Sequence, residues 1–314
     1  MIFSTPNFIY GQKLKELNYE KHKEFFLRWD NDVFLTTDYY YTQGAQLFWV
    51  NPKLRRNPAS YFLIRLKNSD HYFGLGLIQE IFTPKDITDT LLNTIDRPYA
   101  GTLYLKSFVA SANPEKRLKL TSEFDFGFLG PLSGARQAQE KIHDWLGSKP
   151  PKGWDFQIDN RIYLNYNLEL EKEILKIHQI FDVTGVSRFR IGTIHDDLRL
   201  GGKLRIGLLN DYFKGLNLSN RKYTENKDFQ FYFFGGAGVT GVLYDATLMG
   251  GIIPPENNQE YQFREIHHLL ADLNFGLAIT YKMISAKGTV TMISPKFENG
   301  ESHGWGTISL FFRL

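Results

Sequence analysis

Polar and apolar residues alternate over long stretches of this 314-residue chain. In 117–128 the apolar-face positions are Leu118, Leu120, Ser122, Phe124, Phe126 and Phe128, and the polar-face positions are Arg117, Lys119, Thr121, Glu123, Asp125 and Gly127. The same two-residue period recurs in 161–171, 203–208 and 307–314. Because successive side chains of a strand point to opposite faces of a sheet, the pattern predicts strands with one apolar and one polar face.

The alternation predicts about twelve strands of the length that crosses a membrane. They are expected at roughly 23–31, 39–50, 71–81, 99–111, 117–129, 158–173, 177–194, 198–209, 227–240, 266–282, 286–294 and 305–314. Turn-forming sequences such as SANPEK, SAKG and FENGESHG lie between them. We find no linker, low-complexity tract or repeated motif, so residues 1–314 are expected to form a single domain.

Two architectures fit this pattern. A soluble sandwich or barrel encloses its apolar face, whereas a membrane barrel turns that face to lipid and keeps a polar lumen. The long strands, the charges of both signs on the polar faces and the aromatic residues at strand ends (Trp29, Tyr39–Tyr41, Trp49 and Trp305) favour the membrane barrel. We therefore expect an all-β fold, an antiparallel transmembrane β-barrel of about 12 strands.

The amino-acid composition excludes several classes of function. The net charge is only +3, which gives no argument for nucleic-acid binding. The chain has no cysteine, which excludes thiol catalysis, disulfides and cysteine-bound zinc. No apolar run approaches the roughly 18 residues of a transmembrane helix, and the start, MIFSTPNFIYGQKLK, lacks the regions of a signal peptide. The chain is thus either cytoplasmic or a mature form, and a membrane barrel requires the mature form.

One segment departs from the strand pattern. Residues 130–147, GPLSGARQAQEKIHDWLG, have helical spacing. An apolar stripe consists of Ala138, Ile142 and Trp145, and the adjoining stripe of Gln139 and His143. We expect the apolar stripe to dock on the barrel wall and the histidine to face the rim.

The strand order places several polar connections at one rim. With a periplasmic N-terminus, the outer connections are expected at about 31–38, 82–98, 130–157, 194–198, 241–265 and 295–304. The first three contain DNDVFLTTD, TIDRPYAG and the helix, for which Ser133 is the expected N-cap and Gly147 the expected end. Three polar loops far apart in sequence therefore meet at one end of the barrel.

These loops carry the residue types that ester hydrolysis needs. Histidine is the side chain suited to take a proton from water near neutral pH, which makes His143 a candidate base. Calcium prefers carboxylate and carbonyl oxygens, which Asp30, Asn31, Asp32 and Asp38 offer. A calcium ion or an arginine can stabilise the negative charge that develops on the ester oxygen.

Four segments in order, WDNDVFLTTDYYYTQG, DRPYAGTLY, GPLSGARQAQEKIHDWLG and GWDFQIDNRIYLNYNLE, resemble the outer-membrane lipid A 3′-O-deacylase family. The segment VSRFRIGTIHDDLRLGGKLRIG is also similar to that family, and the resemblance spans most of the chain. It implies a twelve-stranded barrel with a calcium-dependent esterase at its outer edge. The implied reaction removes the 3′-linked acyl or acyloxyacyl chain from lipid A of lipopolysaccharide.

The resemblance also implies roles for individual residues. His143 corresponds to the family's histidine base on an outer-loop helix, and Gln139 to the glutamine one turn before it. Asn31 and Asp32 match the pair that serves the Ca²⁺ ion and the scissile ester. No lysine of this chain aligns with the family lysine that helps to stabilise the oxyanion, which leaves Arg97 as the candidate.

The residues alone also allow purely structural roles for these side chains. A single histidine on a short helix is more often structural than catalytic. Asn31 and Asp32 are by default a turn pair, and Asp96 and Arg97 fit a structural ion pair.

Two other functions also remain open. One is an outer-membrane phospholipase, for which Ser133 is the serine near His143 in sequence, and the other is a non-enzymatic pore or structural barrel. We expect a monomer in the bacterial outer membrane, with its signal peptide removed. Its expected partners are lipopolysaccharide and membrane lipids, and no nucleic acid.

Overall fold

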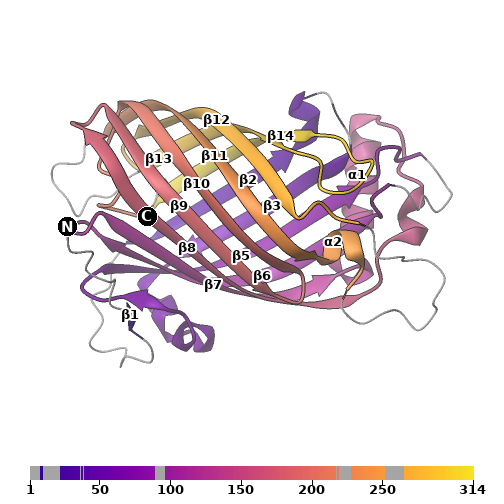
Figure 1. The fold of residues 1–314 in the computed structure, drawn as a ribbon, viewed down its shortest axis with the longest axis horizontal. Coiled ribbons are helices and arrows are strands. Elements are labelled where there is room, and N and C mark those ends of the chain that lie inside the picture. The colour runs from indigo at the N-terminus through magenta and orange to yellow at the C-terminus, as the bar shows by residue number, and fades with distance from the viewer. Residues whose placement is uncertain are drawn as a thin grey trace.

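A closed barrel of twelve antiparallel strands forms the described part of the chain, in the order β10-β11-β12-β13-β14-β2-β3-β5-β6-β7-β8-β9 (Figure 1). The computed structural model describes residues 8–9, 22–35, 37, 39–88, 96–216, 218, 228–251 and 265–314. The wall consists of β2 (Glu24–Asn31), β3 (Tyr40–Val50), β5 (Asp70–Thr83), β6 (Ala100–Asn113), β7 (Leu118–Leu129), β8 (Arg161–Ile177), β9 (Phe181–Gly192), β10 (His195–Leu208), β11 (Phe229–Asp245), β12 (Leu269–Tyr281), β13 (Ile284–Ile293) and β14 (His303–Arg313). Each strand predicted from the alternation is present, with ends that differ by a few residues.

The remaining elements lie in the connections. They are the paired strands β1 (Phe8–Ile9) and β4 (Arg65–Leu66), the α-helices α1 (Ala135–Leu146) and α2 (Ala246–Met249), and the 3-10 helices η2 (Asp32–Leu35), η3 (Pro52–Arg56), η4 (Pro58–Tyr61), η5 (Pro131–Ser133) and η6 (Gly153–Phe156). The short β1–β4 pair was not expected from the sequence. Within the described residues, no helix has the length and apolar character needed to cross a membrane.

The outer face of the wall is apolar and its inner face is polar. On β6, Leu105 is 55% exposed, whereas Tyr104 and Lys106 on either side of it line an internal cavity. On β7, Phe126 and Phe128 are exposed in the same way, and Glu123 lines the cavity. An apolar outer surface belongs in lipid, so the structure is the membrane barrel and not the soluble alternative.

Ion pairs between strands that are adjacent, or separated by one strand, fill the lumen. They include Lys106–Glu123, Arg190–Asp197, Arg199–Asp272, Lys203–Glu171 and Arg205–Asp182. Such pairing offsets the free-energy cost of removing charges from water. It also explains why both signs alternate with apolar residues along the sequence.

The connections after β2, β5, β7, β9, β11 and β13 share one end of the barrel, as the strand order predicts. We call this end the loop end. Figure 1 shows α1 and α2 there, and the C-terminus at the opposite end. The basic segment 51–58, which lies between β3 and β5, is at the end opposite to α1.

Replacing Leu105 with arginine tests the lipid-facing assignment. In lipid vesicles, Leu105→Arg should lower the free energy of unfolding by about 2–4 kcal/mol, because the charge would face hydrocarbon. Leu132→Arg is the matched control: Leu132 is 59% exposed but lies beyond the end of β7, so about 0–1 kcal/mol is expected. Denaturant titration measures both, and negligible losses in both variants would contradict the assignment.

Candidate functional site

Helix α1 packs against the outer face of the wall, where β5 and β6 reach the loop end. Gly101 faces outward, because the inward side chain of Tyr104 lines the cavity three residues further on. A Cβ atom at Gly101 would lie 2.1 Å from the Cβ of Ala135, so only glycine permits this approach of the helix. On β5, Gln79 donates from Nε2 to the carbonyl oxygen of Ser133 at 2.7 Å. These contacts fix the start of α1 on the wall.

The ends of α1 follow the sequence prediction in part. Gly147 ends the helix with a φ of 65°, as expected for a residue in the left-handed region. The N-cap position is Gly134 and not Ser133. Ser133 precedes the cap, and its Oγ accepts a hydrogen bond from the Ala135 N–H at 3.3 Å. The predicted N-cap was therefore wrong by one residue, because η5 (Pro131–Ser133) turns the chain before the helix begins.

The most deeply buried side of α1 is its polar stripe, while its apolar stripe is only partly covered by the wall. Gln139 and His143 are only 1% and 6% exposed, whereas Trp145 is 84% exposed. The prediction that the apolar stripe docks on the wall was wrong for Trp145, but Ala138 packs against a buried cluster there and Ile142 is half-buried. The polar side chains have hydrogen-bond partners on the wall-facing side of the helix. Trp145 points away from the wall, and exposure of so large an apolar side chain is favourable only next to lipid.

Trp154 fixes the orientation of the Gln139 amide. The indole Nε1 of Trp154 donates to Oε1 of Gln139 at 2.8 Å. Since the indole nitrogen is only a donor, the amide must turn its oxygen toward it. Nε2 of Gln139 is buried and has no hydrogen-bond partner among the described residues. Gln139 therefore offers an unused N–H donor at the wall-facing side of α1.

The packing of Trp154 makes this orientation rigid. Trp154 is fully buried in a cluster with Ile81, Tyr99 and Ala135. Its ring lies 4.8 Å from that of Tyr99, measured between centroids. The Tyr99 hydroxyl in turn donates to the carbonyl oxygen of Ile87 at 2.9 Å. The connection between β5 and β6 thus helps to hold Trp154, which itself lies in the connection that follows α1.

The His143 ring is oriented by the turn that follows α1. Its Nδ1 lies 2.6 Å from the carbonyl oxygen of Lys149. A carbonyl oxygen only accepts, so Nδ1 carries the hydrogen, and the neutral ring keeps its lone pair on Nε2. Gly147 makes this possible, because its left-handed conformation turns the chain back and Ser148 donates to the His143 carbonyl oxygen at 2.9 Å. The resulting tautomer is the one a general base needs at Nε2.

Asn31 and Asp32 form a tight turn at the end of β2. The Oδ1 atom of Asn31 accepts from the Val33 N–H at 2.8 Å, and Oδ2 of Asp32 accepts from the Tyr39 N–H at 2.7 Å. Asp30 lines the internal cavity, so the alternation directs Asn31 outward. The turn pair predicted as the default interpretation is therefore present, and it lies at the outer surface.

A row of paired residues links this turn to the helix. Asn31 pairs with Gln43, Gln43 with Ile81, and Ile81 with Gly101 beneath α1. Neighbouring strands lie about 4.8 Å apart, so Asn31 is about 14 Å along the wall from Gly101. A helix with its side chains is about 10 Å across, so about 9 Å, or nearly two strand spacings, separates Asn31 from the near side of a helix centred over Gly101. Asn31 and the start of α1 therefore lie on the same face of the wall, at the same end of the barrel.

Arg97 does not join this group. Its guanidinium lies over the Phe82 ring at 4.5 Å and donates from Nη2 to Oγ1 of Thr247 at 3.3 Å. Arg97 and Phe82 both line the internal cavity. The ring face and Thr247 hold the charge inside the barrel, on the opposite side of the wall from His143.

Asn31 and Asp32 fit a calcium ion by the chemistry of their donors. They offer adjacent amide and carboxylate oxygens, which this hard cation prefers. Asp30 instead pairs with Arg28 in the lumen at 2.9 Å, and Asp38 lies outside the described residues. No group of three His, Cys, Asp or Glu side chains that could hold a metal occurs in the described residues. The remaining oxygens would come from carbonyls, water or substrate.

Fold and site together define an outer-membrane β-barrel with a histidine-bearing helix against its outer wall. Residues 1–314 match the family model of outer membrane protein LpxR, and the chain belongs to that family. LpxR from Salmonella typhimurium has the same fold, with a TM-score of 0.75, 17% sequence identity, and coverage of 92% of this chain and 99% of that one. The β domain of the Bordetella autotransporter BrkA matches with a TM-score of 0.47 at 8% identity, over 94% of this chain and 99% of that domain. No curated protein sequence matches the chain.

Three contributors to the site were missed from the sequence: Trp154, the Lys149 carbonyl group and Gln79. Trp154 lies within the segment GWDFQIDNRIYLNYNLE that carries the resemblance. Nothing in the spacing of Trp154 and Gln139 indicates a hydrogen bond, because the chain between them reverses direction at Gly147. A backbone carbonyl leaves no signal in a sequence at all.

A double-mutant cycle measures the Trp154–Gln139 hydrogen bond. Trp154→Phe keeps an aromatic ring and removes the donor, and Gln139→Leu removes the acceptor. The two substitutions should couple by about 1 kcal/mol in the free energy of unfolding. Trp154→Phe and Trp145→Phe are the control pair and should be additive, because Trp145 is exposed. Additivity of both pairs would show that Trp154 does not hold the amide.

Proposed function

We propose that the protein is a calcium-dependent carboxylic ester hydrolase that removes the 3′-linked acyl or acyloxyacyl chain from lipid A. The observation that carries this proposal is the setting of His143. Its Nδ1–H is bound to the Lys149 carbonyl oxygen, which leaves Nε2 as the base on the outer face of the wall. The sequence resemblance to the lipid A 3′-O-deacylase family supports the choice of substrate.

His143 would act on a water molecule rather than on a protein nucleophile. Nε2 takes a proton as the water oxygen attacks the ester carbonyl carbon, and the imidazolium then returns the proton to the departing sugar oxygen. The fatty acid and the free sugar hydroxyl are the products. Nε2 of Gln139, which the hydrogen bond from Trp154 leaves available, orients the water or the substrate next to His143.

Asn31 and Asp32 would hold the calcium ion. The bound ion supplies positive charge that polarises the ester carbonyl. The protein's own contribution is the rigid turn in which the backbone N–H groups of Val33 and Tyr39 fix both side chains. Asp32 is only 1% exposed, and this burial keeps its carboxylate in place.

The outward-facing apolar residues support a lipid substrate. Trp145 and Leu146 on α1 and Leu132 before it are exposed at the loop end, as Phe126 and Phe128 are on the outer face of β7. A substrate whose acyl chains already lie in the outer leaflet can approach His143 sideways along this surface. A water-soluble ester would gain nothing from it.

The two rival functions receive less support. Ser133 precedes α1, and the rise from Ala135 to His143 alone is about 12 Å, too far for a serine nucleophile to reach its base. A pore needs an open lumen, but the connection after β10 folds into it: Tyr212 donates to Oε1 of Glu171 at 2.8 Å on the inner face of β8. The pore interpretation also gives no reason for the orientation of His143.

Lipid masses test the reaction. Detergent-purified protein incubated with lipid A and Ca²⁺ should remove the 3′ acyl group, and His143→Ala should slow this by at least about 100-fold. His268→Ala is the matched control, an exposed histidine at the loop end whose Nδ1 also lies near a carbonyl oxygen, that of Val242 at 2.8 Å. Ser133→Ala should retain activity. Unchanged masses in every condition with folded protein would contradict the proposal, and full activity of His143→Ala would contradict the assigned base.

Calcium binding can be measured without any substrate. Titration calorimetry should show that Asp32→Asn weakens Ca²⁺ binding about 10-fold or more, because it removes a charged oxygen ligand. Calcium should also raise the midpoint of thermal unfolding, and EDTA should reverse this. Asp159→Asn, an exposed carboxylate at the same end, makes the same charge change and should leave affinity unaltered. Equal affinities for all three proteins would exclude Asp32 as a ligand.

A further inference from the structure

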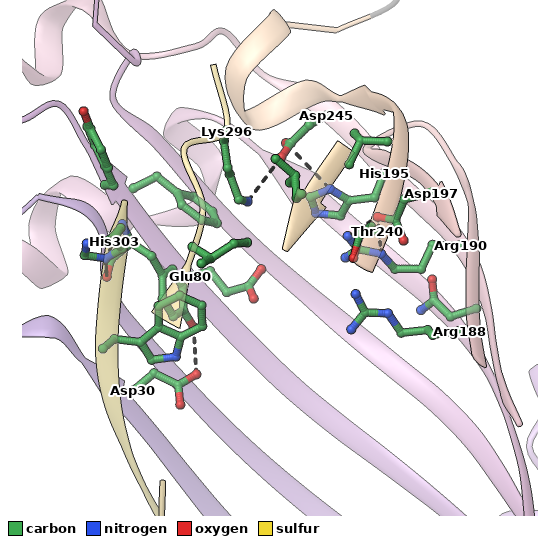
Figure 2. Close-up of a pocket in the computed structure, with 18 of the residues that line it drawn as sticks. Asp30, Glu80, Arg188, Arg190, His195, Asp197, Thr240, Asp245, Lys296 and His303 are labelled. Carbon is green, nitrogen blue, oxygen red and sulfur yellow. Dashed lines mark hydrogen bonds and ion pairs between the residues drawn. The ribbon is translucent and has the colours of Figure 1, made fainter. Parts of the chain in front are cut away.

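A cavity of about 480 Å³ lies inside the barrel (Figure 2). Strands from around the barrel line it, and Lys296 and Phe297 from the connection between β13 and β14 also contribute to its lining. Burial lowers the pKa of Lys296, while Asp245, 3.5 Å away, opposes this shift. The mechanism proposed above uses no residue of this cavity.

The cavity has two chemically different sides. Figure 2 shows Arg188, Arg190, Asp197 and His195 on one side, with Asp30, Glu80 and His303 facing them. The second side is also rich in aromatic rings. Trp305 lies 4.9 Å from the Tyr41 ring and 5.9 Å from the His303 ring, measured between centroids. Charged groups thus face an aromatic surface across the cavity.

Several polar atoms of the lining lack a partner. Nε of Arg188 and Nε1 of Trp305 are buried donors with no hydrogen-bond partner in the described residues, and Oδ1 of Asp197 and Oδ1 of Asn167 are acceptors in the same condition. The neighbouring Arg190 differs, because it pairs with Asp197. Buried polar groups are normally satisfied, so these four atoms are polar groups of the lining residues that the described part of the protein leaves unpaired.

We propose that this cavity binds an acidic saccharide. Sugar hydroxyl groups both donate and accept, which matches a lining that carries guanidinium groups, carboxylates and hydroxyl groups such as those of Arg188, Glu80 and Thr240. The apolar face of a sugar ring can lie against the aromatic side formed by Tyr41 and Trp305, and an acidic group can pair with the guanidinium of Arg188, which points into the cavity (Figure 2). The volume falls in the range of small-molecule sites.

At the end of the barrel opposite to the loop end, side chains occupy the lumen, which favours binding of a saccharide over its passage. Tyr212 and Leu216 from the connection after β10 line a second, smaller cavity further along the lumen. Tyr212 donates to Glu171 and accepts from Lys203, and Lys119 donates to the Leu216 carbonyl oxygen at 3.1 Å. A saccharide that enters from the loop end would therefore stop at the first cavity.

The saccharide released from lipopolysaccharide by alkaline deacylation is the probe for this site. Titration calorimetry with detergent-purified protein should detect its binding, and Arg188→Gln and Trp305→Phe should each weaken it about 10-fold or more. Lys116→Gln, which removes a charge at the opposite end of the barrel, should bind as the wild type does. His143→Ala should also bind unchanged, so that this proposal and the proposed hydrolase can fail separately.

The comparison ligands decide which chemistry is recognised. Maltotriose, a neutral saccharide, and inorganic phosphate should each bind at least 10-fold more weakly than the acidic saccharide. Intact lipopolysaccharide distinguishes a sugar still attached to its lipid from a free one, and dependence on Arg188 in either case supports the site. No binding by the folded wild type, equal binding by Arg188→Gln and Trp305→Phe, or phosphate binding as tight as the saccharide would overturn the proposal.

Discussion

Every strand of this wall turns alternate side chains to lipid and to the lumen, and the rest of the structure depends on that division. The outward positions must be apolar because they meet hydrocarbon. The inward positions carry charges that are stable only as pairs, such as Lys106–Glu123 and Arg205–Asp182. Shifting a strand by one residue would exchange the two sets completely, so the sequence pattern also determines the register.

The same division separates two chemical sites on one wall. Asn31 and His143 lie with the outward set, although one ends a strand and the other lies on a helix beyond the wall. Arg97 and Arg188 belong to the inward set and face the cavity. The proposed esterase therefore works where acyl chains lie, and the proposed saccharide site is enclosed by the barrel. Residues close in sequence, such as Arg97 and Tyr99, serve different sides.

The sequence predicted the barrel well because each strand shows the local alternation of polar and apolar residues. Period, length and turn residues were enough to locate all twelve strands and the common end of their connections. The orientation of α1 was not predictable in this way. Its apolar stripe suggested docking on the wall, but the wall-facing side is decided by Trp154 and the Lys149 carbonyl group, which lie beyond the end of the helix. The position of Arg97 likewise depends on Phe82 and Thr247, and neither pairing has a sequence signal.

The proposed chemistry depends on the Lys149 carbonyl group, which fixes His143 with its proton on Nδ1 and its lone pair on Nε2. Nitrogen NMR of ring-labelled histidine tests this most directly, with His143→Ala used to assign the signal. In the neutral ring, Nδ1 should be protonated and Nε2 unprotonated. A neutral His143 ring with its proton on Nε2 would contradict it, because the base would then face the carbonyl group and not the substrate.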